Sequence, residues 1–95
     1  MEHKNITLTT IAKRADHVMW SPIGHEVMSL NMETGYYYSF NTVGARIWQM
    51  LDGKIALGEI GKALCAQYRQ PQSQIEVDLL ELIQECYHEN LIIAC

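Results

Sequence analysis

The stretch from residue 30 to residue 51 (LNMETGYYYSFNTVGARIWQML) places a turn, three consecutive tyrosines and an amphipathic helix one after another. Tyr36–Tyr38 favour an extended strand, because aromatic side chains pack well on a pleated surface. Gly35 comes just before them and is free to adopt the positive φ of a tight hairpin loop. Asn41 follows the strand and can cap a helix by accepting from its exposed backbone N–H groups. The sequence therefore predicts a strand that leads into a helix almost without a loop.

Two shorter extended segments come before this stretch. Residues 17–20 predict a first strand, which the Ser21-Pro22-Ile23-Gly24 turn would close. Residues 26–30 predict a second strand, which pairs through the turn at Gly35 with a third strand over residues 36–40. Three antiparallel strands are about the minimum that is stable when helices cover one face.

After Asn41 the hydrophobic period changes from two to 3.6 residues, which predicts helices. The first ends at Asp52-Gly53, and the second covers residues 57–68 and ends before Pro71. A capping box of Ser73 and Glu76 would open the third helix, which reaches Glu89 and would be ended by Asn90. We therefore expect one α+β domain over residues 1–95. It has a winged helix-turn-helix-like fold, with a three-stranded antiparallel sheet followed by three helices.

The charge of the chain argues against a nucleic-acid partner. The formal net charge is −4, and the seven Lys and Arg residues are scattered along the sequence. The third predicted helix carries five carboxylates and neither Lys nor Arg, although a recognition helix needs side chains that reach phosphates and base edges. A winged helix-turn-helix DNA-binding regulator is kept as the alternative function, because winged helices also dock through other elements.

The sequence contains no recognisable catalytic or cofactor motif, so we expect neither an enzyme nor a cofactor. Three widely spaced cysteines make no disulfide framework, which favours a reducing, cytoplasmic location. No apolar segment is long enough to cross a membrane, and we expect no membrane partner. The histidines lack the paired spacing of a metal site (His3, His17, His25 and His88).

The aromatic strand has two interpretations. If helices cover one face of the sheet, alternation sends Tyr36, Tyr38 and Phe40 inward and sends Tyr37 and Ser39 outward. An exposed edge of a small sheet can instead accept a peptide as an added strand. The apolar stripe of the third helix is wider than the core needs to cover. An edge strand beside such a helix would form a groove for an extended peptide.

The run from Leu30 to Trp48 resembles the hydrophobic-Asp-x-x-Thr-Gly-x-Tyr-Tyr-x-Leu-Asn-x-Val-Gly-x-x-Ile-Trp pattern of PqqD-like proteins. These are the small chaperones of pyrroloquinoline quinone synthesis and their relatives in lasso-peptide clusters, and the likeness covers roughly residues 17–93. The resemblance implies a winged helix-turn-helix-like fold without DNA binding. This sequence departs from the family pattern at Asn31, Phe40 and Asn90, where the family usually has Asp, Leu and Gly.

The resemblance also implies a partner: the leader region of a ribosomally made precursor peptide, most closely that of a lasso peptide. The leader would add to the third strand, pack its apolar side chains against the third helix, and be delivered to a leader peptidase or other maturation enzyme. We take Leu82 as the example of a core residue on that helix and expect at least one of Leu79, Ile83 and Cys86 to face the groove. Asp78 and Glu85 would flank it. The candidate peptide-binding residues are Tyr36, Tyr37, Tyr38, Asp78, Leu79, Leu82, Ile83, Glu85 and Cys86.

Overall fold

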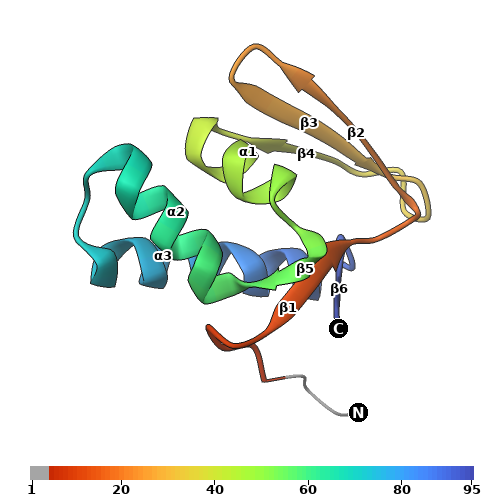
Figure 1. Ribbon diagram of the computed structural model, residues 1–95. Helices are drawn as coiled ribbons and strands as arrows, with labels where there is room; N and C mark the ends of the chain where they lie inside the picture. The colour runs from red at the N-terminus through yellow and green to blue at the C-terminus, as the bar shows by residue number, and fades with distance from the viewer. Residues whose placement is uncertain (1–4) are drawn as a thin grey trace.

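The computed structural model describes residues 5–95, and this part of the chain forms strands and helices in an α+β arrangement (Figure 1). The elements follow one another in the order β1 (Ile11–Arg14), β2 (Val18–Ile23), β3 (Glu26–Asn31), β4 (Tyr37–Phe40), α1 (Thr42–Gln49), β5 (Asp52–Ala56), α2 (Leu57–Tyr68), α3 (Gln72–His88) and β6 (Ile92–Ala94). The expected fold class and the three helices are confirmed. None of the helices in the described part is long and apolar enough to cross a membrane.

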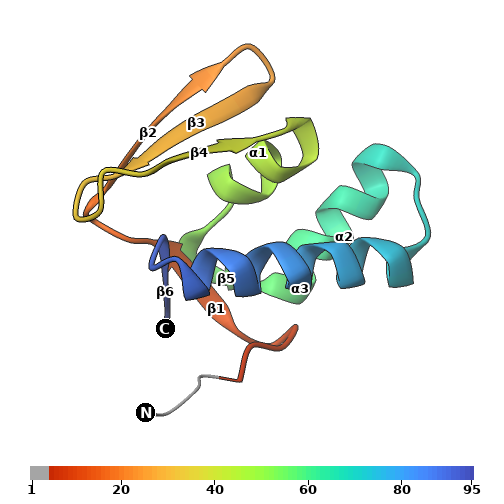
Figure 2. The ribbon, with the colours of Figure 1, turned by 180° about the vertical axis from the view of Figure 1, so that it is seen from behind.

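Two antiparallel sheets build the protein. The first has the strand order β2-β3-β4 and is the predicted three-stranded meander. The second has the order β5-β1-β6 and was not predicted from the sequence. It joins three segments that lie far apart in the chain, and all of them are short. Helix α1 lies against β3 and β4, whereas α2 and α3 pack against each other next to the second sheet (Figures 1 and 2).

An aromatic cluster fixes α1 to the inner face of the first sheet. The ring of Trp48 is buried and stacks on Phe40, with 5.0 Å between the ring centroids, and it meets Trp20 edge to face at 6.4 Å. The guanidinium of Arg14 lies 5.1 Å from the Trp20 ring and donates to the backbone oxygens of Trp48 and Gln49. Because Phe40 is the last residue of β4, this cluster also holds the end of that strand in place.

Two boundaries differ from the sequence-based expectation. Strand β2 continues through Pro22, and the turn lies at Gly24 and His25. Pro22 is tolerated there because β2 is an edge strand. The N–H that proline lacks would point to the open side of β2, where there is no ladder bond to lose. Asp52 and Gly53 do not simply end the first helix but begin β5. Gly53 has a φ of 78°, a conformation that few residues other than glycine adopt.

The prediction for the start of α3 was wrong, whereas the prediction for its end is confirmed. The capping box of Ser73 and Glu76 is wrong: the N-cap is Pro71, no side chain caps this end, and Gln72 Nε2 donates to Glu76 instead. The predicted terminator is confirmed, because Asn90 has a φ of 60° and directly follows Glu89, the C-cap of the helix. The backbone N–H of Leu91 then donates to the oxygen of Cys86 at 2.9 Å, which closes the helix end in a Schellman-type arrangement.

Candidate functional site

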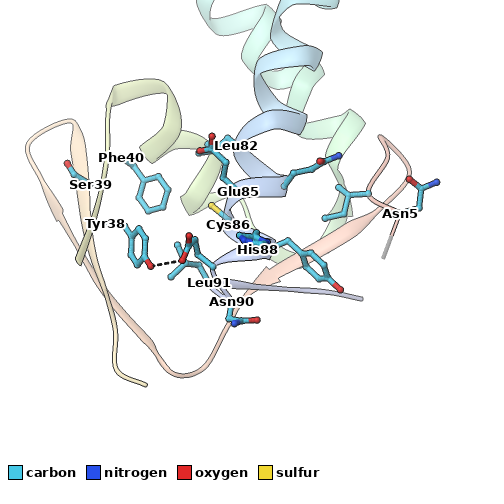
Figure 3. Close-up of a pocket in the computed structure, with 14 residues that line it drawn as sticks. Asn5, Tyr38, Ser39, Phe40, Leu82, Glu85, Cys86, His88, Asn90 and Leu91 are labelled. Atoms are coloured by element: carbon cyan, nitrogen blue, oxygen red, sulfur yellow. Dashed lines mark hydrogen bonds between the residues drawn. The ribbon is translucent and has the colours of Figure 1, made fainter. Parts of the chain in front are cut away.

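A cleft of about 1310 Å³ lies between β4 and the C-terminal half of α3 (Figure 3). Tyr38 and Phe40 form the strand side of this cleft, and Leu82, Glu85 and Cys86 form much of the helix side. In Figure 3 the two aromatic rings point from the strand toward the helix, whereas Ser39 points away from the cleft. Residues more than 40 positions apart in the sequence thus come together here, because the aromatic cluster fixes β4 and the core fixes α3.

Strand β4 has a free edge on the side opposite β3. The strand stands last in the order β2-β3-β4, and within residues 5–95 no strand pairs with its other side. The N–H of Asn31 donates to the oxygen of Tyr36, so by the alternation of antiparallel ladders the backbone groups of Tyr38 and Phe40 also face β3. Those of Tyr37 and Ser39 therefore face the open edge. Two N–H and two C=O groups are presented along β4.

The side chains of β4 follow the predicted alternation for four residues. Phe40 is buried and Tyr38 is half-buried on the inner face, whereas Tyr37 and Ser39 are exposed on the outer face. The prediction was wrong for Tyr36, which lies just before the strand and is 66% exposed. Neither Tyr36 nor Tyr37 lines the cleft with its side chain. Tyr37 can contribute its backbone to an added strand, whereas Tyr36 lies before β4 and its oxygen already accepts from the N–H of Asn31.

Two neighbouring residues on α3 differ in burial. Leu82 was named both as a candidate peptide-binding residue and as an example of a core residue, and it is half-buried and lines the cleft. Ile83, a candidate groove residue, is completely buried in the core and lines neither of the two cavities described here. The reason is that the core side of α3 runs through Ile75, Leu79, Ile83 and Cys86, while Leu82 lies on the flank of this stripe that turns toward β4.

Cys86 and Glu85 both line the cleft, as expected for groove residues. The Cys86 side chain is almost completely buried, and this burial, with a smaller contribution from the carboxylate of Glu85, raises the pKa of the thiol to about 12. The thiol is therefore protonated at neutral pH, and Cys86 acts as a small apolar wall residue. Glu85 is exposed and brings a carboxylate to the cleft.

A polar contact closes one end of the cleft. The hydroxyl of Tyr38 donates to the Glu89 carboxylate at 3.1 Å, from β4 to the residue that follows α3 (Figure 3). Partial burial, then this hydrogen bond and the carboxylate's charge, raise the pKa of Tyr38, so the hydroxyl keeps its proton. The side chain of Asn31 accepts from the N–H groups of Glu33 and Thr34 and donates to the oxygen of Glu89. An Asp could not make this last bond, which gives the departure at Asn31 a structural reason.

A second cavity of about 430 Å³ continues beyond the end of β4, between the start of α1, the end of α2 and the first half of α3. Ser39, Phe40 and Leu82 line both cavities, so the two are neighbours along the strand. Two further candidates, Asp78 and Leu79, lie here and not in the main cleft. Neither this cavity nor the role of Glu89 in the main cleft was predicted from the sequence. The signal for Glu89 was its position one helical turn after Glu85 on the same face.

The lining residues limit the chemistry of the site. None of the described residues that line either cavity is Lys or Arg, so neither cavity offers the cationic groups that phosphates need. Among residues 5–95 there is also no group of His, Cys, Asp and Glu side chains that could hold a metal ion, and His3 lies outside this range. An apolar cleft beside a free strand edge is suited to an extended polypeptide.

The family profile described as "Coenzyme PQQ synthesis protein D (PqqD)" matches residues 26–92, which is more than half of the chain. The chain belongs to the PqqD family. The resemblance noted in the sequence is thereby confirmed, and the matched region contains β3, β4 and all of α3, the elements that border the cleft.

Two solved structures share the fold of this PqqD-family protein. "TbiB1 in Complex with the TbiA(beta) Leader Peptide" has 32% sequence identity and a TM-score of 0.79, and the match covers 84% of this chain and 93% of that one. "Lasso peptide synthetase B1 complexed with the leader peptide" has 16% identity and a TM-score of 0.78, with coverage of 87% and 98%. The second match supports the fold alone. A search of curated protein sequences gave no match.

Proposed function

We propose that this PqqD-family protein is a single-domain, non-catalytic binding protein that captures the leader region of a ribosomally made precursor peptide. The observation that carries the proposal is the free edge of β4 beside an apolar cleft walled by α3. A leader that pairs with Tyr37 and Ser39 would turn alternate side chains into the cleft, against Leu82 and Cys86. The solved relative with 32% identity is named as a leader-peptide complex, which supports this use of the fold.

The charge of the two cavities supports a preference within the leader. Glu85 lines the main cleft and Asp78 lines the second cavity, and both residues are exposed. A basic or polar leader residue beside either carboxylate would therefore be favoured over an acidic one.

We place the protein in the cytoplasm, in keeping with its three free cysteines. The Thr34–Tyr38 run resembles that of lasso-peptide members, so we propose a lasso-peptide precursor.

Delivery of the leader to a leader peptidase or other maturation enzyme is the second part of the proposal. The outer face of the first sheet is apolar: Met19, Leu30 and Tyr37 form one row across the strands, and Met28 lies in the next row. Met19 and Tyr37 are 59% and 69% exposed. A leader paired with β4 would extend this same face by one strand. An enzyme that docks on the face would then contact the leader and its carrier together.

Leader binding is tested by fluorescence polarisation with two labelled ligands, a leader peptide of the precursor encoded beside this protein and a DNA duplex. We expect saturable leader binding that changes little between low and moderate salt, and no duplex binding. The alternative, a winged helix-turn-helix DNA-binding regulator, predicts duplex binding that weakens steeply with salt. Duplex binding without leader binding would refute the proposed function.

Delivery is tested by a substitution on the outer face, Met28→Lys. We expect leader affinity to stay within about twofold of the wild type, because the Met28 side chain faces away from the cleft. The rate at which a purified leader peptidase cleaves the leader should no longer rise when the variant is added. Val77→Lys is the matched control, since Val77 is an exposed apolar residue on α3 that lines neither cavity. Equal stimulation by both variants would mean that the enzyme docks elsewhere.

A further inference from the structure

The second cavity is a space that strand addition alone does not use. Its walls are apolar and belong to the core, and they include Leu64, Ile75 and Leu79, each at most 4% exposed. Its rim is polar and includes Tyr68 and Asp78. A deep apolar floor under a polar rim is the usual form of a pocket that accepts one side chain.

The position of the cavity relates it to the free edge. Ser39 is the last residue of β4 whose backbone groups face the edge, and Asn41 already caps α1 with a bond from Gly44 N to its side-chain oxygen at 2.9 Å. An added strand must therefore leave β4 near Ser39. Because Ser39, Phe40 and Leu82 line both cavities, the next inward side chain of such a peptide would reach the second cavity.

Gly44 lies where the two cavities meet. It is buried in α1, and a methyl group added there would lie 3.5 Å from Phe40 Cβ and 3.6 Å from Leu82 Cδ2, two residues that line both cavities. The same methyl group would lie 3.3 Å from the side-chain oxygen of Asn41, a tight contact that requires Asn41 to shift by a few tenths of an ångström. Glycine is generally less favourable than alanine within a helix. Glycine at this position leaves room for the Asn41 cap and also keeps the space beside Phe40 and Leu82 open, at the junction of the two cavities.

Resting on the proposed function, we infer that the second cavity is a specificity subsite for one bulky apolar side chain of the leader, and that Gly44 sets its size limit. The subsite reads the residue that lies beyond the strand-paired segment. Strand pairing supplies affinity through backbone groups that every peptide has, so this cavity adds a choice of sequence that the edge cannot make.

The test is a selection from an mRNA-displayed library of random 12-residue peptides on wild-type protein, on Gly44→Ala and on Gly61→Ala. Gly61 is the matched control: it is also a buried helical glycine, its added methyl group would meet Leu79 at an ordinary 3.6 Å, and it lines neither cavity. We expect wild type and Gly61→Ala to enrich a bulky apolar residue at one fixed position. Gly44→Ala should shift that position alone to small residues. It should also bind the wild-type peptide roughly tenfold more weakly, as one methylene in a pocket does.

If Gly44→Ala folds poorly, an NMR titration of the wild-type protein tests the subsite in its place. Wild-type protein with ¹³C-labelled methyl groups is titrated with the selected peptide, and the methyl resonances of Leu64 and Leu79 should shift when the bulky residue is present and stay in place when it is alanine. The same preference in all three pools, or unmoved Leu64 and Leu79 resonances, would overturn the subsite and leave peptide capture standing. Failure of wild type to enrich any peptide would instead overturn the proposed function, and the subsite with it.

Discussion

Replacing Tyr37 with proline should abolish capture of an extended peptide while the protein stays folded. The N–H of Tyr37 faces the open edge of β4, so its loss removes no bond to β3. A net hydrogen bond contributes only about 0.5–1.5 kcal/mol, but the proline ring also occupies the space that an added strand would need. We expect leader affinity to fall by much more than tenfold in fluorescence polarisation. Circular dichroism should show a melting temperature close to that of the wild type.

The control for this experiment is proline at the next residue. Tyr38 is paired with Ser29, and its backbone groups face β3, so Tyr38→Pro removes a bond within the sheet. This variant should be strongly destabilised, unlike Tyr37→Pro. Normal leader binding by a folded Tyr37→Pro protein would show that the peptide does not pair with β4. Equal unfolding of both variants would show that the backbone of Tyr37 serves the fold and not the edge.

The local features of residues 30–51 were predictable because their causes are local. Gly35 has the positive φ that its place in the hairpin turn demands, and Asn41 caps α1 with its own side chain. Both effects depend on groups within four residues of one another in the chain. The free edge of β4 followed from the same stretch, since a short meander ends at its last strand.

The second sheet could not be predicted from local patterns. Strands β1, β5 and β6 have four, five and three residues, too few for a clear alternation, and each finds its partner only in the folded chain. Asp52 and Gly53 carry the residue types of a helix end, and the pairing of Asp52 with Lys13 that makes them part of a strand is a tertiary contact. The second cavity was missed for the same reason, because it needs three helices in place.

The division of α3 into a core side and a cleft side was also beyond the sequence. Periodicity shows that Leu82 and Ile83 both belong to a wide apolar stripe, and the two are adjacent in the chain. Only the place of β4 beside the helix decides which flank of the stripe meets the cleft. The width of the stripe did indicate, however, that α3 has an apolar flank beside its core side, where Leu82 lines the cleft.

Truncating Leu82 and Ile83 to alanine should separate binding from stability at neighbouring positions. Ile83 is completely buried and lines neither cavity, so Ile83→Ala should lower the free energy of unfolding by about 2–5 kcal/mol. In a domain of this size that loss lowers the melting temperature by roughly 10 °C or more. Leu82 is half-buried and lines both cavities, so Leu82→Ala should cost stability only about 1 kcal/mol. Its leader affinity should fall roughly tenfold, because an apolar wall of the cleft is lost.

Thermal unfolding followed by circular dichroism measures the first effect, and fluorescence polarisation corrected for the folded fraction measures the second. Ile83→Val is the milder companion, with an expected cost of about 0.5–1.5 kcal/mol, should Ile83→Ala not fold. The folded fraction of either Ile83 variant should bind the leader as the wild type does. If Leu82→Ala kept full affinity while an Ile83 variant lost it, the leader would contact α3 on its core-facing side. The cleft between β4 and α3 would then not be the binding site.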